Sequence, residues 1–267
     1  MNSIEKFYNN ISNNKHICVG LDTDIFKIPK FLLKYEDPIF EFNKIIVDTT
    51  IDLASAYKLN LAFYEQSGIQ GLKSLKKSIE YIGDRSFIIG DAKRGDIGNT
   101  SEMYAKALFT HLKMDASTIN PYMGYDSIEP FLRFEDKLNF ILVLTSNNGA
   151  NDFEKLPLMS GKFLYQEVLS KVNDWNRAKN CGIVFGATQI EELETNISEF
   201  NEMPVLIPGV GAQGGDLISI RNLMKKHNYK NYLINSSRGI IYKDNSESFG
   251  AVARQELINL NKILIEN

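Results

Sequence analysis

The sequence predicts an α/β fold, a (β/α)8 TIM barrel formed as a single domain by residues 1–267, and three observations support this prediction. Short apolar, β-rich runs recur along the chain at intervals too long for hairpins. Several of these intervals carry apolar residues at helical spacing, and strands that alternate with helices pair in parallel. A chain of 267 residues with 43% hydrophobic residues can bury one large core, and a TIM barrel takes about 250 residues.

The expected strands follow one another along the whole chain. We place them at residues 17–20, 56–63, 87–90, 116–119, 140–144, 182–185, 205–207 and 232–234. Helical periodicity is clearest over residues 42–53, 104–112 and 249–260, and a further helix is expected at 217–226. The polar segment 149–161 is interpreted as a loop or a short extra helix. No Pro-rich or Gly/Ser-rich linker divides the chain, so we expect one domain.

Composition and charge argue against several classes of protein. The net charge of −3 and the pI near 5.7 give no general attraction to nucleic acid or to an anionic membrane. No apolar stretch approaches the ~20 residues of a membrane span, and the polar first 16 residues do not have the form of a signal peptide. We therefore expect a cytoplasmic protein. Cys18 and Cys181 each lie beside an apolar strand-like run, which favours buried free thiols.

A lysine lies between two carboxylates directly after the expected strand at 87–90. Asp91 and Lys93 leave that strand on one face, because side chains alternate across a strand with period 2. Asp96 follows at the start of the turn, where a short loop could bring it to the same ammonium group. Lys58 lies inside another strand and needs a partner such as Asp91, although taken singly it could extend to solvent. These charges are expected at the carboxyl ends of the strands, where TIM barrels have their active sites.

A second candidate site follows the last two strands. The strand at 205–207 leads into Pro208-Gly209-Val210-Gly211-Ala212-Gln213-Gly214-Gly215 and then into the expected helix. Glycines let backbone N–H groups converge on an anion, and a helix N-terminus adds partial positive charge. The pattern also matches a dinucleotide fingerprint, but the acidic residue expected ~20 positions later is missing, and the glycines could simply form a tight turn. Arg238 follows the eighth strand, where it can form a two-pronged contact with a phosphate.

The remaining polar residues at strand ends are less specific. Asp22 follows the first strand and Ser146 the fifth. Thr100, or Asn99 together with Glu102, is equally interpreted as the N-cap of a helix that begins near Glu102. The three histidines have no metal-ligand spacing, so no metal site is expected.

The stretch Asp91-x-Lys93-x-x-Asp96-Ile97-Gly98-Asn99-Thr100 resembles the signature of the orotidine 5′-monophosphate decarboxylases. Other parts of the pattern stand in the family's order: Gly20-Leu21-Asp22, Lys58, Thr145-Ser146-Asn147, the 208–215 segment and Ser237-Arg238-Gly239. Residues 61–65 and 120–127 are similar to the longer bacterial, type 2 subgroup. Asn148 stands where that subgroup usually has proline. This difference affects the expected rigidity of the loop and not the expected chemistry.

The resemblance implies conversion of orotidine 5′-monophosphate (OMP) to uridine 5′-monophosphate (UMP) and CO2, the last step of de novo pyrimidine synthesis, with no metal or organic cofactor. It implies a homodimer with shared active sites and the following roles, by position. Lys58, Asp91, Lys93 and Asp96 form the charged catalytic network, and Lys93 protonates C6. Asp22 and Lys58 hold the ribose, and Ser146 bonds the pyrimidine. Gln213 and Arg238 grip the phosphate beside Pro208, Gly209 and Gly211, and Asp96 and Thr100 serve the partner subunit's substrate.

Two other hypotheses remain open from the sequence. One is a related phosphosugar barrel with the same Asp-x-Lys-x-x-Asp core, such as a hexulose-phosphate synthase or a keto-gulonate-phosphate decarboxylase, which uses magnesium. The other is a non-catalytic barrel that binds phosphorylated nucleotides as a sensor. Dependence of the activity on a metal would distinguish the phosphosugar barrel from the decarboxylase. A requirement for Lys93 would distinguish the decarboxylase from the sensor, whose site does not need this lysine.

Overall fold

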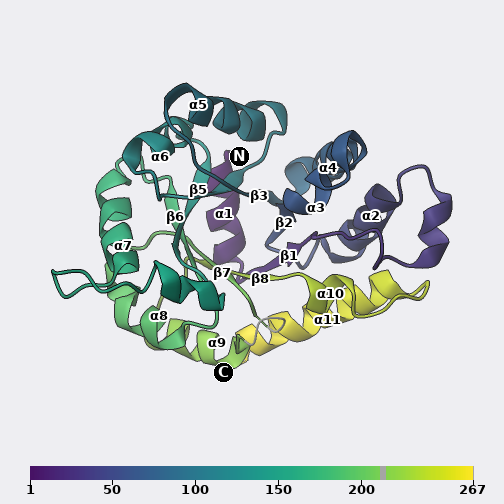
Figure 1. The fold of residues 1–267 in the computed structure, drawn as a ribbon. Coiled ribbons are helices and arrows are strands. Elements are labelled where there is room, and N and C mark those ends of the chain that lie inside the picture. The colour runs from purple at the N-terminus through teal and green to yellow at the C-terminus, as the bar shows by residue number, and fades with distance from the viewer. Residues whose placement is uncertain (211–214, 267) are drawn as a thin grey trace.

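The computed structural model, which describes residues 1–210 and 215–266, is a closed barrel of parallel strands in the order of the chain (Figure 1). Its strands are β1 (Ile17–Gly20), β2 (Ala56–Asn60), β3 (Phe87–Arg94), β4 (Ala116–Ile119), β5 (Leu138–Leu144), β6 (Cys181–Phe185), β7 (Val205–Pro208) and β8 (Tyr232–Ser236). Each strand pairs with the next one, and β8 closes the barrel on β1 through the register Ile17 to Ile234. The prediction of a TIM barrel is confirmed.

Helices follow the strands and surround the barrel, except α1, which precedes β1 and lies within the ring of helices (Figure 1). The longer ones are α1 (Ser3–Ser12), α2 (Pro38–Thr50), α4 (Gly68–Ile82), α5 (Gly98–Lys106), α6 (Tyr125–Leu132), α7 (Leu164–Trp175), α8 (Ile190–Asn196), α9 (Leu217–Lys226) and α11 (Phe249–Ile265). Short elements are α3 (Ala62–Glu65), α10 (Arg238–Ile241), η1 (Lys30–Lys34), η2 (Gly83–Arg85), η3 (Ala107–His111), η4 (Asn148–Asp152) and η5 (Ile197–Phe200).

The element boundaries differ from the sequence-based ones where polar residues enter the strands. β3 continues through Arg94, so that Asp91 and Lys93 belong to the strand itself. The run at 56–63 is split, because Asn60 ends β2 and its side-chain oxygen accepts a hydrogen bond from the Ala62 N–H at 3.2 Å. The segment 149–161 contains most of η4, a single helical turn, and then a loop.

The core has an inner and an outer layer. Inside the barrel, Phe7 and Ile11 of α1 pack with strand residues such as Cys18, Ala56 and Phe140. The outer layer fills the space between the strands and the surrounding helices. The apolar side chains of α1 and of the strands fill the amino-terminal end of the barrel. The buried polar side chains of the strands, such as Lys58 and Asp91, lie toward the carboxyl end.

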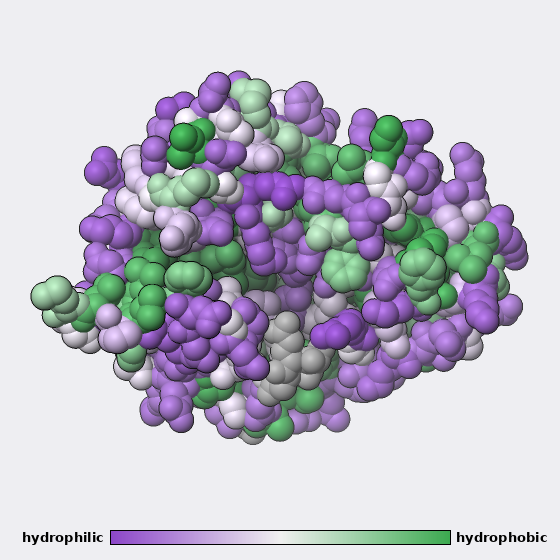
Figure 2. All heavy atoms as spheres, viewed as in Figure 1, coloured by the Kyte–Doolittle hydropathy of each residue, from purple (hydrophilic) through white to green (hydrophobic). Residues whose placement is uncertain are grey.

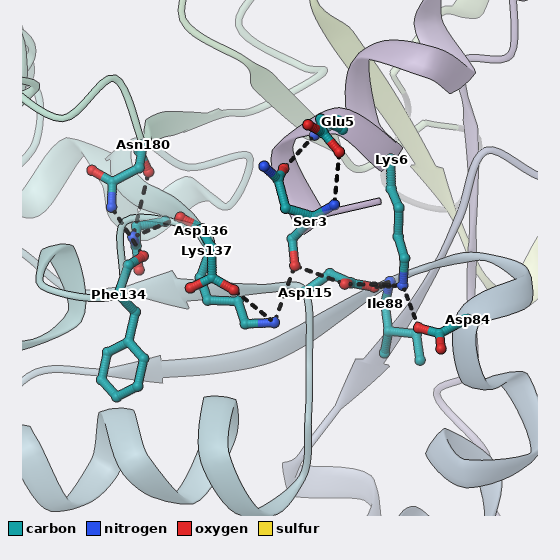
Figure 3. Close-up of polar contacts among 12 residues, drawn as sticks. Ser3, Glu5, Lys6, Asp84, Ile88, Asp115, Phe134, Asp136, Lys137 and Asn180 are labelled. Atoms are coloured by element: carbon teal, nitrogen blue, oxygen red, sulfur yellow. Dashed lines mark hydrogen bonds and ion pairs between the residues drawn. The ribbon is translucent and has the colours of Figure 1, made fainter.

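Asp115 fastens α1 to the barrel wall (Figure 3). Its carboxylate is buried and accepts hydrogen bonds from Ser3 Oγ at 2.8 Å, from Lys6 Nζ at 3.2 Å and from the Ile88 backbone N–H at 2.9 Å. Lys6 Nζ also reaches Asp84, whose side chain is fully exposed. Asp115 therefore supplies a buried acceptor to all three donors.

Asp115→Ala is expected to lower the free energy of unfolding by about 3 kcal/mol, because it leaves the buried Ile88 N–H without an acceptor and the largely buried Lys6 with the exposed Asp84 in place of a buried counter-charge. Urea denaturation measures the effect. Asp84→Ala is the matched control: it removes the exposed partner of the same lysine and should leave the denaturation midpoint unchanged. Equal destabilisation by the two changes would show that Asp115 does not have this role.

Both cysteines are buried and free, as expected from the sequence. Burial raises the pKa of the Cys18 thiol and of the Cys181 thiol to about 12.

In residues 1–210 and 215–266, no helix has the length and apolar character that crossing a membrane requires.

Candidate active site

A cavity of about 270 Å³ opens at the carboxyl ends of the strands. Every strand or the loop after it contributes to the lining: Asp22, Lys58, Asn60, Asp91, Lys93, Thr118, Leu142, Thr145, Ser146, Asn147, Val184, Leu206, Pro208, Gly209, Val210, Asn235, Ser237 and Arg238. Figure 2 shows hydrophilic residues gathered around the hollow centre of this face. Asp22, Lys58, Asp91, Lys93, Ser146, Pro208, Gly209 and Arg238, all predicted site residues, thus line one cavity at the carboxyl end of the barrel.

Asp91 lies between two lysines at the floor of this cavity. Its Oδ2 is 2.7 Å from Lys58 Nζ, and its Oδ1 is 2.5 Å from Lys93 Nζ. Lys58 is only 3% exposed, so the alternative in which it extends to solvent is wrong. The side chain of Lys93 is half exposed and faces the cavity. The prediction that Asp91 pairs with Lys58 and shares a face with Lys93 is confirmed.

The charges of this group stabilise one another against burial. Burial disfavours the charged form of Lys58, but Asp91 and Asp22 outweigh it and raise the pKa of Lys58 above its ordinary value. Burial alone would raise the pKa of Asp91, yet the ammonium groups of Lys58 and Lys93 hold that pKa well below its usual range. At neutral pH the floor of the cavity therefore carries a carboxylate between two ammonium groups.

Thr118 completes this arrangement, and the sequence analysis missed it. Its Oγ1 donates to Asp91 Oδ1 at 3.0 Å and accepts a hydrogen bond from the Lys93 backbone N–H, also at 3.0 Å. Lys93 has a φ of +47°, a left-handed conformation that is uncommon for a residue with a side chain. Thr118 thus helps to hold an unusual backbone at the lysine that faces the cavity. Its position two residues after Ala116, on the inward face of β4, was the available signal.

Asp22 lies beside Lys58 and faces the same cavity. Its Oδ2 accepts a hydrogen bond from Ser237 Oγ at 2.7 Å. Its Oδ1 is 3.5 Å from Lys58 Nζ and has no hydrogen-bond partner among the residues that the structure describes. A buried carboxylate oxygen in that state is suited to accept a hydrogen bond from a ligand.

The loop that carries Ser146 is braced by side chains. The Thr145 backbone N–H donates to Glu154 at 2.7 Å, Thr188 Oγ1 donates to the Ser146 carbonyl at 3.0 Å, and Gln189 Nε2 donates to the Thr145 carbonyl at 3.2 Å. These contacts hold the loop without a proline at position 148.

The opposite side of the cavity is formed by Pro208, Gly209 and Arg238. Gly209 has a φ of +98°, which favours glycine at this bend. Two predicted residues of this loop, Gly211 and Gln213, lie outside the described residues.

The first turn of α9 is capped by a side chain of this chain, which the sequence analysis did not predict. Asp216 caps this helix, and its side chain accepts hydrogen bonds from the backbone N–H groups of Ile218 at 3.0 Å and Ser219 at 3.3 Å. The carboxylate occupies these two donors and adds a negative charge at the start of the helix, so the part of the predicted anion site that remains is the 208–215 loop. Among the described residues, Arg238 is the cationic residue that lines this side of the cavity.

Comparison with known proteins agrees with this geometry. A family model described as "Orotidine 5′-phosphate decarboxylase / HUMPS family" matches residues 15–251. The chain belongs to this family. It is 46% identical over 258 residues to a Parabacteroides distasonis protein named orotidine 5′-phosphate decarboxylase, covering 96% of this chain and 92% of the relative. A Porphyromonas gingivalis protein of the same name is 48% identical over 244 residues, covering 90% and 88%.

Solved structures of the decarboxylase family have the same fold. Leishmania donovani OMP decarboxylase has a TM-score of 0.84 at 32% identity, with 100% of both chains covered. The structure of Leishmania donovani UMP synthase has a TM-score of 0.85 at 33% identity, but the match covers 99% of this chain and 57% of that one.

Two residues of the decarboxylase-like signature lie away from this chain's own cavity. The Asp96 carboxylate accepts a hydrogen bond from the Ile97 N–H at 2.8 Å, and Asp96 is not among the residues that line the cavity. A short loop therefore does not bring Asp96 to Lys93 within one chain. Thr100 is exposed in the first turn of α5.

The helix-cap interpretations of Thr100, and of Asn99 with Glu102, are wrong. The N-cap residue of α5 is Ile97, and no side chain caps the helix. Glu102 instead forms an ion pair with Lys106 at 2.6 Å. Thr100 therefore does not cap this helix, which was the alternative to a role in a functional site.

Histidine, cysteine and carboxylate side chains are the groups that could hold a metal ion. Among residues 1–210 and 215–266, no group of three or more His, Cys, Asp or Glu side chains is arranged to hold a metal ion. His16 is buried and stacks on Tyr232, with ring centroids 4.2 Å apart.

Proposed function

We propose that this chain decarboxylates OMP to UMP and CO2 in pyrimidine synthesis, at the cavity at the carboxyl end of the barrel. The observation that carries the proposal is the Asp91 carboxylate, 2.7 Å from Lys58 Nζ and 2.5 Å from Lys93 Nζ. Only Lys93 of the two lysines extends into the open part of the cavity. The curated relatives at 46–48% identity, which are named for this activity, support the choice of substrate.

The chemical difficulty is a carbanion at C6. Breaking the bond between C6 and the carboxylate releases CO2 and leaves the electron pair on a ring carbon that cannot delocalise it. The Lys93 ammonium stabilises that pair and then gives C6 its proton, forming the C6–H bond of UMP. The neutral amine left behind regains a proton from solvent. Asp91 holds the ammonium group in position toward the reacting carbon.

One ammonium group is not sufficient for a large rate enhancement. At about 4 Å it contributes roughly 4 kcal/mol for an effective dielectric near 20, whereas enzymes commonly lower barriers by about 8–23 kcal/mol. Binding of the remote parts of the nucleotide supplies more, because it fixes the substrate against the prearranged charges.

We assign the nucleotide's parts to the walls of the cavity. Arg238 pairs with the phosphate, beside Pro208 and Gly209. The free Oδ1 of Asp22 accepts a hydrogen bond from a ribose hydroxyl next to Lys58. Ser146 serves the pyrimidine ring. Gly211 and Gln213 keep their predicted role at the phosphate.

A spectrophotometric assay that follows the loss of orotate absorbance tests this function. We expect turnover of OMP that persists in excess EDTA, because the proposed chemistry uses side-chain charges alone. Loss of turnover on chelation, restored by Mg²⁺, would favour the magnesium-dependent phosphosugar barrels instead. Binding of UMP with no turnover of OMP would favour a nucleotide sensor.

We further propose a homodimer in which Asp96 and Thr100 complete the partner subunit's site. Asp96 does not line its own cavity. Apolar side chains that follow it in the chain are exposed, including Ile97 at 57% and Met103 at 54%. Apolar exposure of this kind marks surfaces that pack against another protein.

Mixing two inactive variants tests the shared site. Neither Lys93→Ala nor Asp96→Ala homodimers have an intact site, but a mixed dimer has one. Equal amounts of both chains should recover about one quarter of the wild-type activity, since about half of the dimers are mixed. Absence of recovery in verified mixed dimers would show that each subunit has a self-contained site.

A further inference from the structure

The segment after β8 holds the Asp22 loop at two separate points. Ser237 Oγ donates to Asp22 Oδ2 at 2.7 Å. The Tyr242 hydroxyl donates to the Asp22 backbone carbonyl at 3.0 Å and accepts a hydrogen bond from the Asp24 N–H at 2.6 Å. Ser237 and Tyr242 stand on either side of α10, the short helix that begins with Arg238. One segment therefore carries Arg238 and also fixes Asp22.

The Ser237 side chain bonds Asp22 and does not cap its own helix, α10. It is the N-cap residue of α10, a position where serine side chains normally accept a hydrogen bond from the helix. The Ser237 side chain makes no such bond. Gly20 leaves the space for its actual position, because a Cβ at Gly20 would lie 1.7 Å from Ser237 Oγ. The hydroxyl is thus directed to the Asp22 carboxylate.

Tyr242 is a rigid donor. Its ring stacks on Phe42 with centroids 5.8 Å apart, and Phe42 stacks on Phe249 with centroids 5.0 Å apart. Burial raises the pKa of Tyr242 to about 12, so the hydroxyl keeps its proton near neutral pH. The aromatic stack fixes the ring, and the ring fixes the backbone of the Asp22 loop.

These contacts determine which oxygen of Asp22 is available. Because Ser237 occupies Oδ2, Oδ1 is left buried, without a hydrogen-bond partner among the described residues, at the cavity wall. We propose that Ser237 and Tyr242 are positioning residues that orient Asp22 and thereby set the selectivity of the site for nucleotides that carry ribose hydroxyls. This inference rests on the proposed function, which places the ribose at Asp22.

The test compares two probes, UMP and 2′,3′-dideoxyuridine 5′-monophosphate, by calorimetric titration. The ratio of their Kd values measures the contribution of the ribose hydroxyls. The parent protein should prefer UMP by at least about 30-fold, since the hydroxyls meet charged groups. Ser237→Ala should reduce this preference about tenfold and Tyr242→Phe about threefold.

Tyr229→Phe is the matched control. The Tyr229 hydroxyl also donates to a backbone carbonyl, that of Met203, and Tyr229 does not line the cavity. This variant should keep the parent ratio, as a purely structural loss weakens both probes equally.

The outcomes separate this inference from the proposed function. If the parent turns over OMP and the ratio is unchanged in both Ser237→Ala and Tyr242→Phe, the positioning role is wrong and the decarboxylase function stands. An equal loss of affinity for both probes in these variants would also contradict the positioning role. If the parent neither turns over OMP nor binds UMP, the proposed function fails and the inference fails with it.

Discussion

Lys93→Ala is expected to lower the turnover of OMP by at least about 10⁴-fold, because it removes both the proton donor and the ammonium group that faces the reacting carbon. UMP binding should survive within about tenfold, since the binding groups on the other walls of the cavity remain. Steady-state kinetics and calorimetric titration measure the two quantities.

Lys226→Ala is the control for the loss of a paired lysine. Lys226 forms an ion pair with Glu194 and does not line the cavity, so this variant should turn over OMP at the parent rate. An unchanged rate in Lys93→Ala would exclude Lys93 as the donor.

Asp91→Ala is expected to abolish measurable turnover and also to destabilise the fold by about 3–5 kcal/mol at neutral pH, because the buried Lys58 ammonium loses its closest counter-charge. The pKa of Asp91 is lowered in the folded state, so its contribution is complete above its unfolded pKa of about 3.9 and is lost as the pH falls below that value. The pKa of Lys58 is raised, so its contribution is complete below about 10.4 and is lost as the pH rises further.

The stability difference between the parent and Asp91→Ala should therefore be greatest between about pH 4 and pH 10 and shrink outside that window. Urea denaturation across this range measures it. Lys58→Met combined with Asp91→Ala removes both buried charges and should recover much of the lost stability without recovering activity. Failure of the double variant to exceed Asp91→Ala in stability would show that an unpaired Lys58 is not the cause.

The catalytic floor could be predicted from the sequence because its signals are local. Asp91 and Lys93 follow an apolar run at period 2, and Lys58 interrupts another apolar run where a buried charge needs a partner. The barrel could be predicted because apolar runs alternate with helical periodicity over the whole chain.

The roles of Thr118 and Ser237 were missed because strand register decides the partners of their hydroxyl groups. Thr118 meets Asp91 only through the irregular pairing of β3 with β4, and Ser237 meets Asp22 only because β8 closes on β1 beside Gly20. The local sequence around a serine or threonine at a strand end does not predict which residue its hydroxyl group contacts.

The cap of α9 was missed for a different reason. The glycine-rich segment favours an anion site, but Asp216 immediately before an apolar helical run is itself a strong N-cap signal. For Asp96, the local sequence cannot distinguish a contact within the chain from one across a subunit interface.

One measurement tests the proposed chemistry most directly: the purified protein is incubated with OMP in D2O and the products are followed by NMR. We expect OMP to be replaced by UMP with deuterium at C6 and by one CO2 for each UMP, because the Lys93 ammonium exchanges its protons with solvent before it protonates C6. Unchanged OMP, or UMP that carries protium at C6, would contradict decarboxylation through a carbanion that Lys93 protonates.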